Sequence, residues 1–345
     1  MKKILVVDDE PNNLQLLRQV LREHYQLCFA TDGETALAAA EQQRPDMVLL
    51  DIMMPGMDGY EVCRRLKRNA AIGHIPVIFI TAMSESEDEA RGFDAGGVDY
   101  IQKPVSAPVV LRRVQTHLSL VRARSLEDSQ RETIYMMGMA GHYNDIDTGM
   151  HIWRMAAYCS YLARLAGWPE DEVERIELAA PMHDTGKIGI PDRILKAPRQ
   201  LNDAEWQIMK THSRIGYDIL CRGHSPLFAL AAQIALSHHE RWDGSGYPQG
   251  LAGAAIPECG RIVALADVFD ALTTKRPYKQ PWSIETAAAE IALGDGRHFD
   301  PQLVALFSAN LDGFAAIKHD WDIKEAELQA PGLNMLRLHE QQAMG

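Results

Sequence analysis

Five short apolar runs in the first third of the chain constrain its fold more than any other feature. The runs are rich in β-branched residues, which is typical of buried strands, and they occupy residues 3–7, 26–30, 47–50, 77–80 and 99–101. The segments between them, such as 12–24 and 34–43, have the apolar spacing of amphipathic helices. Strands that alternate with helices form right-handed βαβ units around a parallel sheet. The first third is therefore predicted to be an α/β domain with a doubly wound parallel sheet.

The rest of the chain has no such strands. Residues 108–137 are predicted to form one long, charged helix, and the pattern beyond it is helical, interrupted by glycine and proline turns. We therefore expect an all-α second domain. The predicted divisions are a first domain at 1–122, a helical linker at 123–133, a second domain at 134–317 and a helical tail at 318–345 to which no motif assigns a role. Since residues 122–132 lack glycine and proline, this junction could transmit a rotation or a change in dimer packing.

Composition limits the partners of the chain. A length of 345 residues fits two domains, and a net charge of -12 argues against a general nucleic-acid binder, which presents a basic face to phosphates. Five cysteines without a CxxC pair indicate reduced thiols in a cytosol. The first apolar run is interrupted by acids after four residues, unlike a signal peptide, and no stretch approaches the roughly 20 apolar residues of a membrane span. We expect a soluble, cytoplasmic protein that binds neither DNA nor membranes.

Polar side chains follow the predicted strands. Asp8 and Asp9 come after the first strand, Asp51 after the third, Thr81 after the fourth and Lys103 after the fifth. Ligands of parallel sheets bind at the carboxyl ends of the strands. The carboxylates suit a hard divalent cation, with Asp51 also a nucleophile for phosphoryl transfer, while Lys103 and Thr81 would contact the phosphoryl group. Taken singly, the aspartate pair is also typical of a helix N-cap, and Thr81 of an ordinary strand.

Four strings in order, VVDDE, LLDIMMPGMDGYE, FITA and YIQKP, make residues 1 to about 122 resemble the receiver domain of bacterial two-component response regulators. The resemblance implies a flavodoxin-like fold, Mg²⁺ at the aspartates and phosphorylation of Asp51 by a sensor histidine kinase. It also implies that Tyr100 switches rotamer together with Thr81, and that the bond before Pro104 is cis.

Histidines concentrate in the second part of the chain, where ten of the 13 lie beyond residue 141. Asp147 and His151 are four residues apart, so they share one face of a helix. Imidazole and carboxylate ligands suit Fe, Mn, Zn or Ni rather than Ca, and two or more ions could share them. Adjacent His238 and His239 cannot point the same way from a regular helix, which suits either different metals or a helix end. The further candidate ligands are His183, Asp184, His212 and Asp267.

The remaining histidines have weaker patterns around them. Four are interpreted as ordinary surface residues: His24, His74, His117 and His339. For four others both interpretations stay open, with the structural one favoured: His142, His224, His298 and His319.

The strings PMHDTGKIGIPDRIL, MKTHSRIGYDIL, LSHHERWDGSGYP, RIVALADVFDALTTKRPYK and GRHFDPQLV make roughly residues 127–315 resemble the HD-GYP phosphodiesterases. The resemblance implies an HD-superfamily fold that hydrolyses cyclic di-GMP to pGpG and/or GMP at two or three metals. It implies that Asp184 bridges metals and that Lys187 contacts the phosphate or the bridging hydroxide. The other core ligands would be His183, His212, His238, His239 and Asp267, and the substrate-binding residues would be Arg276, Lys279, Gly246, Tyr247 and Pro248.

One position departs from that family. The chain has Asp147 in DTGMH, where the family usually has glutamate. Aspartate is one methylene shorter, so its carboxylate would not reach a third metal as well. We therefore expect a binuclear site, or a weakly occupied third site, and a preference for stopping at pGpG.

Two other functions remain open at this point. One is a catalytically weak module that signals through protein contacts, at the GYP loop or with diguanylate cyclases. The other is an HD phosphohydrolase acting on another nucleotide, including a mixed cyclic dinucleotide. In either case, phosphorylation of Asp51 is expected to change the junction helix or a homodimer interface.

Overall fold

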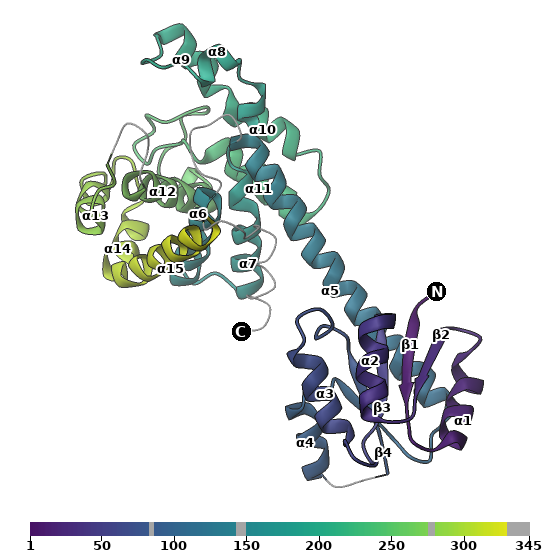
Figure 1. Ribbon diagram of the computed structural model, residues 1–345. Coiled ribbons are helices and arrows are strands. Elements are labelled where there is room, and N and C mark those ends of the chain that lie inside the picture. Colours follow the sequence, from purple (N-terminus) through teal and green to yellow (C-terminus); the bar gives the residue numbers. More distant parts are fainter. Residues whose placement is uncertain (83–85, 143–149, 275–279, 330–345) are drawn as a thin grey trace. The chain divides into compact units, whose positions relative to one another are not determined.

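The computed structural model describes residues 1–82, 86–142, 150–274 and 280–329 (Figure 1). Three candidate site residues, Asp147, Arg276 and Lys279, lie outside these ranges. The chain divides into two compact units, Met1–Asp128 and Ser129–Gly345. The first contains a five-stranded sheet and the second is helical, so the predicted order of an α/β domain followed by an all-α domain is confirmed.

The sheet of the first unit is parallel, in the order β2-β1-β3-β4-β5. Its strands are β1 (Lys3–Val7), β2 (Gln26–Ala30), β3 (Met47–Asp51), β4 (Val77–Thr81) and β5 (Asp99–Gln102). The helices between them are α1 (Pro11–Leu21), α2 (Gly33–Gln43), α3 (Gly59–Arg68) and α4 (Ser86–Asp94). Each of the five predicted strands is present. The order places β1 beside β3, so the ends that carry Asp8 and Asp51 meet.

Both faces of the sheet are buried at its three inner strands, β1, β3 and β4. Along β1, Ile4 and Val6 pack against α1 and α5 (Ala107–His142), whereas Leu5 and Val7 face the core shared with α2 and α3. Successive side chains of a strand point to opposite faces, so a strand covered on both sides must be apolar at every position. This explains the apolar runs of β1, β3 and β4, whereas the edge strands β2 and β5 are partly exposed.

The first helix ends earlier than its apolar spacing predicted. The sequence favoured a helix to residue 24, but α1 ends at Leu21. The backbone N–H groups of His24 and Tyr25 both donate to the Leu21 carbonyl, which closes a turn before β2 starts at Gln26. The second helix begins one residue before the predicted segment, because the Asp32 side chain caps it by accepting from the Thr35 N–H.

The predicted junction helix is present as α5, which is continuous and longer than the predicted 108–137. The helices after it are α6 (Met150–Leu165), α7 (Glu170–Ala179), α8 (Asp192–Leu195), α9 (Asp203–Lys210), α10 (His212–Leu220), α11 (Pro226–Ser237), α12 (Glu258–Thr273), α13 (Ile284–Leu293), α14 (Pro301–Ala309) and α15 (Leu311–Gln329). Three short 3₁₀ helices lie among them: η1 (Ala180–Met182), η2 (Thr185–Gly189) and η3 (Gly253–Ala255).

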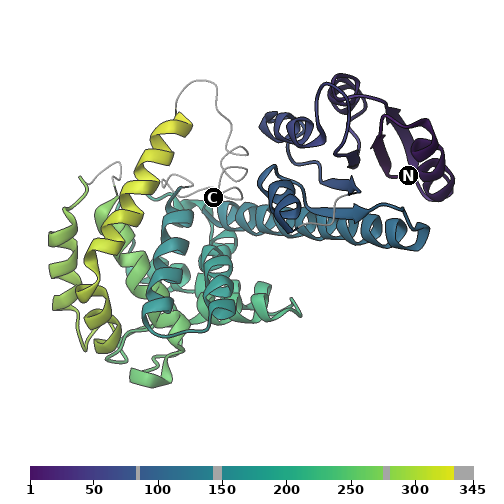
Figure 2. The same ribbon diagram turned by 90° about the horizontal axis from the view of Figure 1, so that it is seen from below.

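The core of the helical unit joins α6, α12, α14 and α15. Tyr158, Phe269, Phe307 and Phe314 are fully buried and pack edge to face or tilted, with ring centroids 4.7–5.8 Å apart. Helix α15, yellow in Figure 2, packs on α6. This core fixes α6 and α12, the two helices that carry His151 and Asp267. Among the helices described, none combines the length and the apolar character needed to cross a membrane.

Candidate functional site

The first candidate site lies at the carboxyl ends of β1 and β3. One carboxylate oxygen from each of Asp8, Asp9 and Asp51 lies within 4.8 Å of the others. The Lys103 ammonium is 3.1 Å from Asp8 Oδ2 and 3.0 Å from Asp51 Oδ1. These four predicted residues are therefore brought together by strands that are distant in the sequence.

Electrostatics at this site follow from burial and from Lys103. Burial raises the pKa of Asp51, Asp8 adds to this, and the hydrogen bond from Lys103 offsets only part of the change. Burial lowers the pKa of the Lys103 ammonium, but its bonds to Asp51 and Asp8 outweigh that effect and raise it above its ordinary value. The lysine is therefore held charged beside the acids, ready to meet a phosphoryl group.

Thr81 ends β4, the neighbour of β3, and Tyr100 lies on β5 beyond it. Thr81 is buried at the end of β4, and Tyr100 is half-buried beneath the Arg113 guanidinium, whose carbon lies 5.5 Å from the ring centroid. The Lys103–Pro104 bond is cis, as the resemblance implied. The coupled rotation of Thr81 and Tyr100 stays a prediction.

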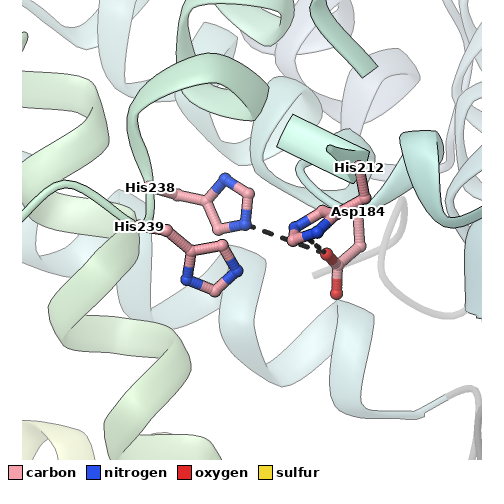
Figure 3. A group of neighbouring side chains, drawn as sticks. All are labelled: Asp184, His212, His238 and His239. Carbon is pink, nitrogen blue, oxygen red and sulfur yellow. Dashed lines mark ion pairs between the residues drawn. The ribbon is translucent and has the colours of Figure 1, made fainter. Parts of the chain in front are cut away.

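The second candidate site begins with a group of four side chains, Asp184, His212, His238 and His239, whose ligand atoms lie within 4.8 Å of one another. Asp184 Oδ1 is 3.3 Å from His212 Nε2 and 3.8 Å from His238 Nε2 (Figure 3). Helix α11 ends at Ser237, immediately before the two adjacent histidines. Because the helix ends there, both His238 and His239 can belong to one group.

Close backbone packing brings Asp184 to His212. A Cβ atom on Gly186 would lie 1.9 Å from the His212 carbonyl oxygen, so a glycine is needed for η2 to pass this close to α10. The same turn places Lys187 one turn after Asp184, with Nζ 2.7 Å from Asp184 Oδ2.

A second group adjoins the first and consists of His151 on α6, His183 at the end of η1 and Asp267 on α12. His151 Nε2 is 3.5 Å from Asp267 Oδ1, and His183 Nε2 is 3.2 Å from Asp184 Oδ2. The two oxygens of Asp184 thus face different groups: Oδ1 faces the histidines of the first and Oδ2 faces His183 of the second.

Main-chain carbonyls orient three of these imidazoles. Nδ1 of His183, His212 and His238 lies 2.9, 2.7 and 3.1 Å from the carbonyls of Ala180, Met209 and Ile234. A carbonyl only accepts, so Nδ1 carries a proton in each ring and Nε2 is the nitrogen that faces the group.

His238 supplies a direct test of whether metal fits the site. Its Nε2 atom is buried and has no hydrogen-bond partner in the described part of the chain. Burial and the neighbouring His239 hold the pKa of His238 well below its usual range, and burial lowers that of His239 to about 3. Neutral, inward-facing imidazoles beside a carboxylate are the donor set that divalent transition metals take.

The loop containing Gly246, Tyr247 and Pro248 lies against the first group. The Tyr247 ring is 4.7 Å from that of His239, and Lys210 Nζ is 5.3 Å from the Tyr247 centroid. A Cβ atom on Gly246 would lie 2.3 Å from the Arg241 nitrogen, so this tight backbone path requires glycine. The Tyr247–Pro248 bond is cis.

Glu240, which the sequence analysis did not single out, holds the far end of this loop. Its buried carboxylate accepts from the N–H groups of Gln249, at 2.7 Å, and Leu251, at 3.0 Å. Its only sequence signal was its place directly after the two histidines.

Replacing Glu240 by glutamine is expected to lower the free energy of unfolding by about 1–3 kcal/mol, because an amide offers one acceptor oxygen and leaves a buried donor unsatisfied. Urea denaturation measures this. The matched control is Glu290→Gln on the exposed side of α13, expected to stay within about 0.5 kcal/mol of wild type. Equal stability of the two variants would show that Glu240 does not hold the loop.

Two more residues missed by the sequence analysis lie behind His151, Asp270 in contact with it and Arg154 in contact with Asp270. Asp270 Oδ2 lies 2.5 Å from His151 Nδ1, and Arg154 Nε donates to Asp270 Oδ1 at 2.7 Å. Each lies three residues after a predicted ligand on the same helix, Arg154 after His151 and Asp270 after Asp267. That spacing was the available signal.

The structure separates other histidines from these groups. His117 contacts Asp99 at 2.9 Å, and His298 stacks on Phe299. His224 and His319 are exposed. None of these four belongs to a metal-type group among the described residues.

Comparison with protein families accounts for both parts of the chain. Residues 4–115 match the response regulator receiver domain, and residues 115–303 match the HD domain. The chain is an HD-domain response regulator.

Two relatives match this response regulator along both parts, and a third matches little more than half of it. A probable cyclic di-GMP phosphodiesterase of Vibrio cholerae is 39% identical, over 94% of this chain and 81% of the relative. The cyclic di-GMP phosphodiesterase response regulator RpfG of Xanthomonas campestris is 39% identical, over 87% of this chain and 85% of RpfG. A 3'3'-cGAMP-specific phosphodiesterase of V. cholerae is 46% identical over 56% of this chain and 37% of its own length.

Proposed function

We propose that the HD domain hydrolyses cyclic di-GMP to pGpG and/or GMP, and that phosphorylation of Asp51 regulates it. The observation that carries this proposal is the position of Asp184, whose two carboxylate oxygens face two adjacent groups of histidines and acids. A carboxylate placed in this way can serve two metal ions at once. Relatives with both domains are named cyclic di-GMP phosphodiesterases, which supports the same substrate.

The residues proposed to hold metal form two sets. Asp184, His212, His238 and His239 would hold one ion, and His151, His183 and Asp267 would hold the other together with Asp184. Fe, Mn, Ni or Zn suits these nitrogen and oxygen ligands. Such ions supply neutralisation of the phosphodiester oxygens and a lowered pKa for water.

The chain's own groups would orient the substrate around Asp184. The Lys187 ammonium lies one turn after Asp184 and contacts its carboxylate. We propose that it binds the scissile phosphate and that Lys187, His183 and Asp184 are the catalytic residues. Tyr247, between His239 and Lys210, offers a ring face at the edge of the group. The other residues proposed to bind substrate are Gly246, Pro248, Arg276 and Lys279.

In the receiver, Asp8, Asp9 and Asp51 would hold Mg²⁺, and a sensor histidine kinase would supply the phosphoryl group. Thr81, Tyr100 and Lys103 would respond to it. The unbroken helix α5 supports the junction proposed at 123–133, between domains at 1–122 and 134–317, as the element that carries the change to the output or to a homodimer.

The aspartate at position 147 leads to a prediction about metal number. Wild-type protein reconstituted without oxygen is expected to hold two ions tightly per chain and to accumulate pGpG, because the shorter carboxylate reaches a third ion poorly. Asp147→Glu is expected to add a third ion and shift the product toward GMP. Metal analysis measures the number of ions, and chromatography measures the products. Three tightly held ions in the wild type would contradict this prediction.

A substrate panel tests the proposed function. Purified full-length protein loaded with Mn²⁺ or Fe²⁺ is offered cyclic di-GMP, 3'3'-cGAMP and a linear dinucleotide. Highest kcat/KM for cyclic di-GMP is the expected result. Highest kcat/KM for 3'3'-cGAMP would favour the second candidate, which the 46% identical relative supports. If the metal-loaded protein hydrolyses neither cyclic dinucleotide, the result would support a signalling module without catalytic activity.

A further inference from the structure

His151 differs from the other oriented imidazoles in what its Nδ1 atom meets. His183, His212 and His238 contact main-chain carbonyls, whereas His151 contacts the carboxylate of Asp270. A carboxylate partner fixes the orientation of an imidazole and makes its other nitrogen a stronger ligand. That other nitrogen, His151 Nε2, faces Asp267.

Asp270 is itself held from a second side. The Arg154 guanidinium donates to both of its oxygens, Nε to Oδ1 at 2.7 Å and Nη2 to Oδ2 at 3.1 Å. Two parallel bonds of this kind define the plane of a carboxylate as well as its distance. Asp270 is 0% and Arg154 1% exposed, so water cannot substitute for either partner.

Arg154 also connects this pair of residues to helix α15. Arg154 Nη1 donates to Glu325 Oε2 on α15 at 3.3 Å, and Nη2 donates to Thr274 Oγ1 at 2.8 Å. The Trp321 ring on α15 also stacks on Trp153 of α6, with centroids 6.0 Å apart. Residues of α15 thus contact α6 at Trp153 and Arg154, two and three positions after His151.

Resting on the proposed function, we propose that Asp270 and Arg154 are positioning residues for His151, and that Glu325 extends this support to α15. The ion held by His151, His183 and Asp267 would then depend on the C-terminal helix. The ion held by His212, His238 and His239 would not, because carbonyls of α9 and α11 orient His212 and His238.

Equilibrium dialysis of the full-length chain against graded Mn²⁺ tests this proposal. Mg²⁺ in excess keeps the receiver acids Asp8, Asp9 and Asp51 occupied, so wild type is expected to show two Mn²⁺ binding steps, both in the helical unit. Asp270→Asn is expected to weaken one step by about 10- to 100-fold, the usual effect of removing an outer partner of a ligand, and to leave the other unchanged. Unchanged affinity at both steps would overturn the proposal.

A buried ion pair elsewhere in the same unit gives the matched control. Asp300 is buried and paired with Arg261, so Asp300→Asn removes a comparable interaction without touching His151. It is expected to lower stability and keep both Mn²⁺ steps. Equal loss of one step in both variants would show a general structural effect and contradict a positioning role.

A milder variant covers the case in which Asp270→Asn does not fold. Glu325 is 22% exposed, so Glu325→Gln is expected to fold and to weaken the same step by a smaller factor. A folded Glu325→Gln variant with wild-type Mn²⁺ affinity would overturn the role of α15. Wild type that binds two ions and leaves cyclic di-GMP intact would contradict the proposed function alone.

Discussion

Asp184→Asn is expected to reduce kcat for cyclic di-GMP by about three orders of magnitude or more. The amide keeps the shape of the side chain but has one oxygen and no charge, so it cannot serve both groups that Asp184 faces. Metals contribute several kcal/mol of charge stabilisation in a transition state, and each 1.36 kcal/mol corresponds to about tenfold in rate. Chromatography of the products and metal analysis of the same samples measure the effect.

The matched control for this variant is Asp192→Asn. Asp192 is an exposed acid at the start of α8, paired with Lys196 at 3.0 Å, and lies eight residues after Asp184. It is expected to keep wild-type turnover and metal content. Asp184→Asn with turnover within about tenfold of this control would contradict the assignment of Asp184.

Asp51→Asn is expected to abolish phosphorylation of the receiver. The amide is not a nucleophile for phosphoryl transfer, and it removes the carboxylate that Lys103 contacts and that would share Mg²⁺ with Asp8 and Asp9. Intact-mass measurement after incubation with acetyl phosphate and Mg²⁺ shows the acyl phosphate directly. The wild-type chain is expected to gain one phosphoryl group and to change its rate of cyclic di-GMP turnover or its oligomeric state.

Asp58, in the segment that joins β3 to α3, provides the control for Asp51→Asn. Asp58 is exposed and caps α3, where its side chain accepts from the Glu61 N–H at 2.8 Å. Asp58→Asn is expected to be phosphorylated as wild type is. A phosphoryl group on Asp51→Asn would place the acceptor elsewhere in the chain.

The receiver site could be predicted from the sequence because strand position alone determines it. Residues that end neighbouring parallel strands meet at one edge, so Asp8, Asp51 and Lys103 were predictable once the strands were recognised. The end of α1 was not, because helical spacing continues past Leu21 and only the backbone turn at His24 and Tyr25 ends the helix.

The helical unit was predictable to a lesser degree. Spacing indicates which residues share a face of a helix, but not which helix packs against that face. Arg154 and Asp270 are 116 residues apart and meet only because α6 packs on α12. For the same reason the sequence did not indicate that Glu325 would contact Arg154.

The most direct test of the account is turnover of cyclic di-GMP measured against the number of metal ions bound per chain. Full-length protein is prepared without oxygen and loaded in steps with Mn²⁺ or Fe²⁺. Turnover is predicted to rise with occupancy and to require ions in both groups that Asp184 faces. A chain with both groups filled that binds cyclic di-GMP and leaves it intact would contradict the account.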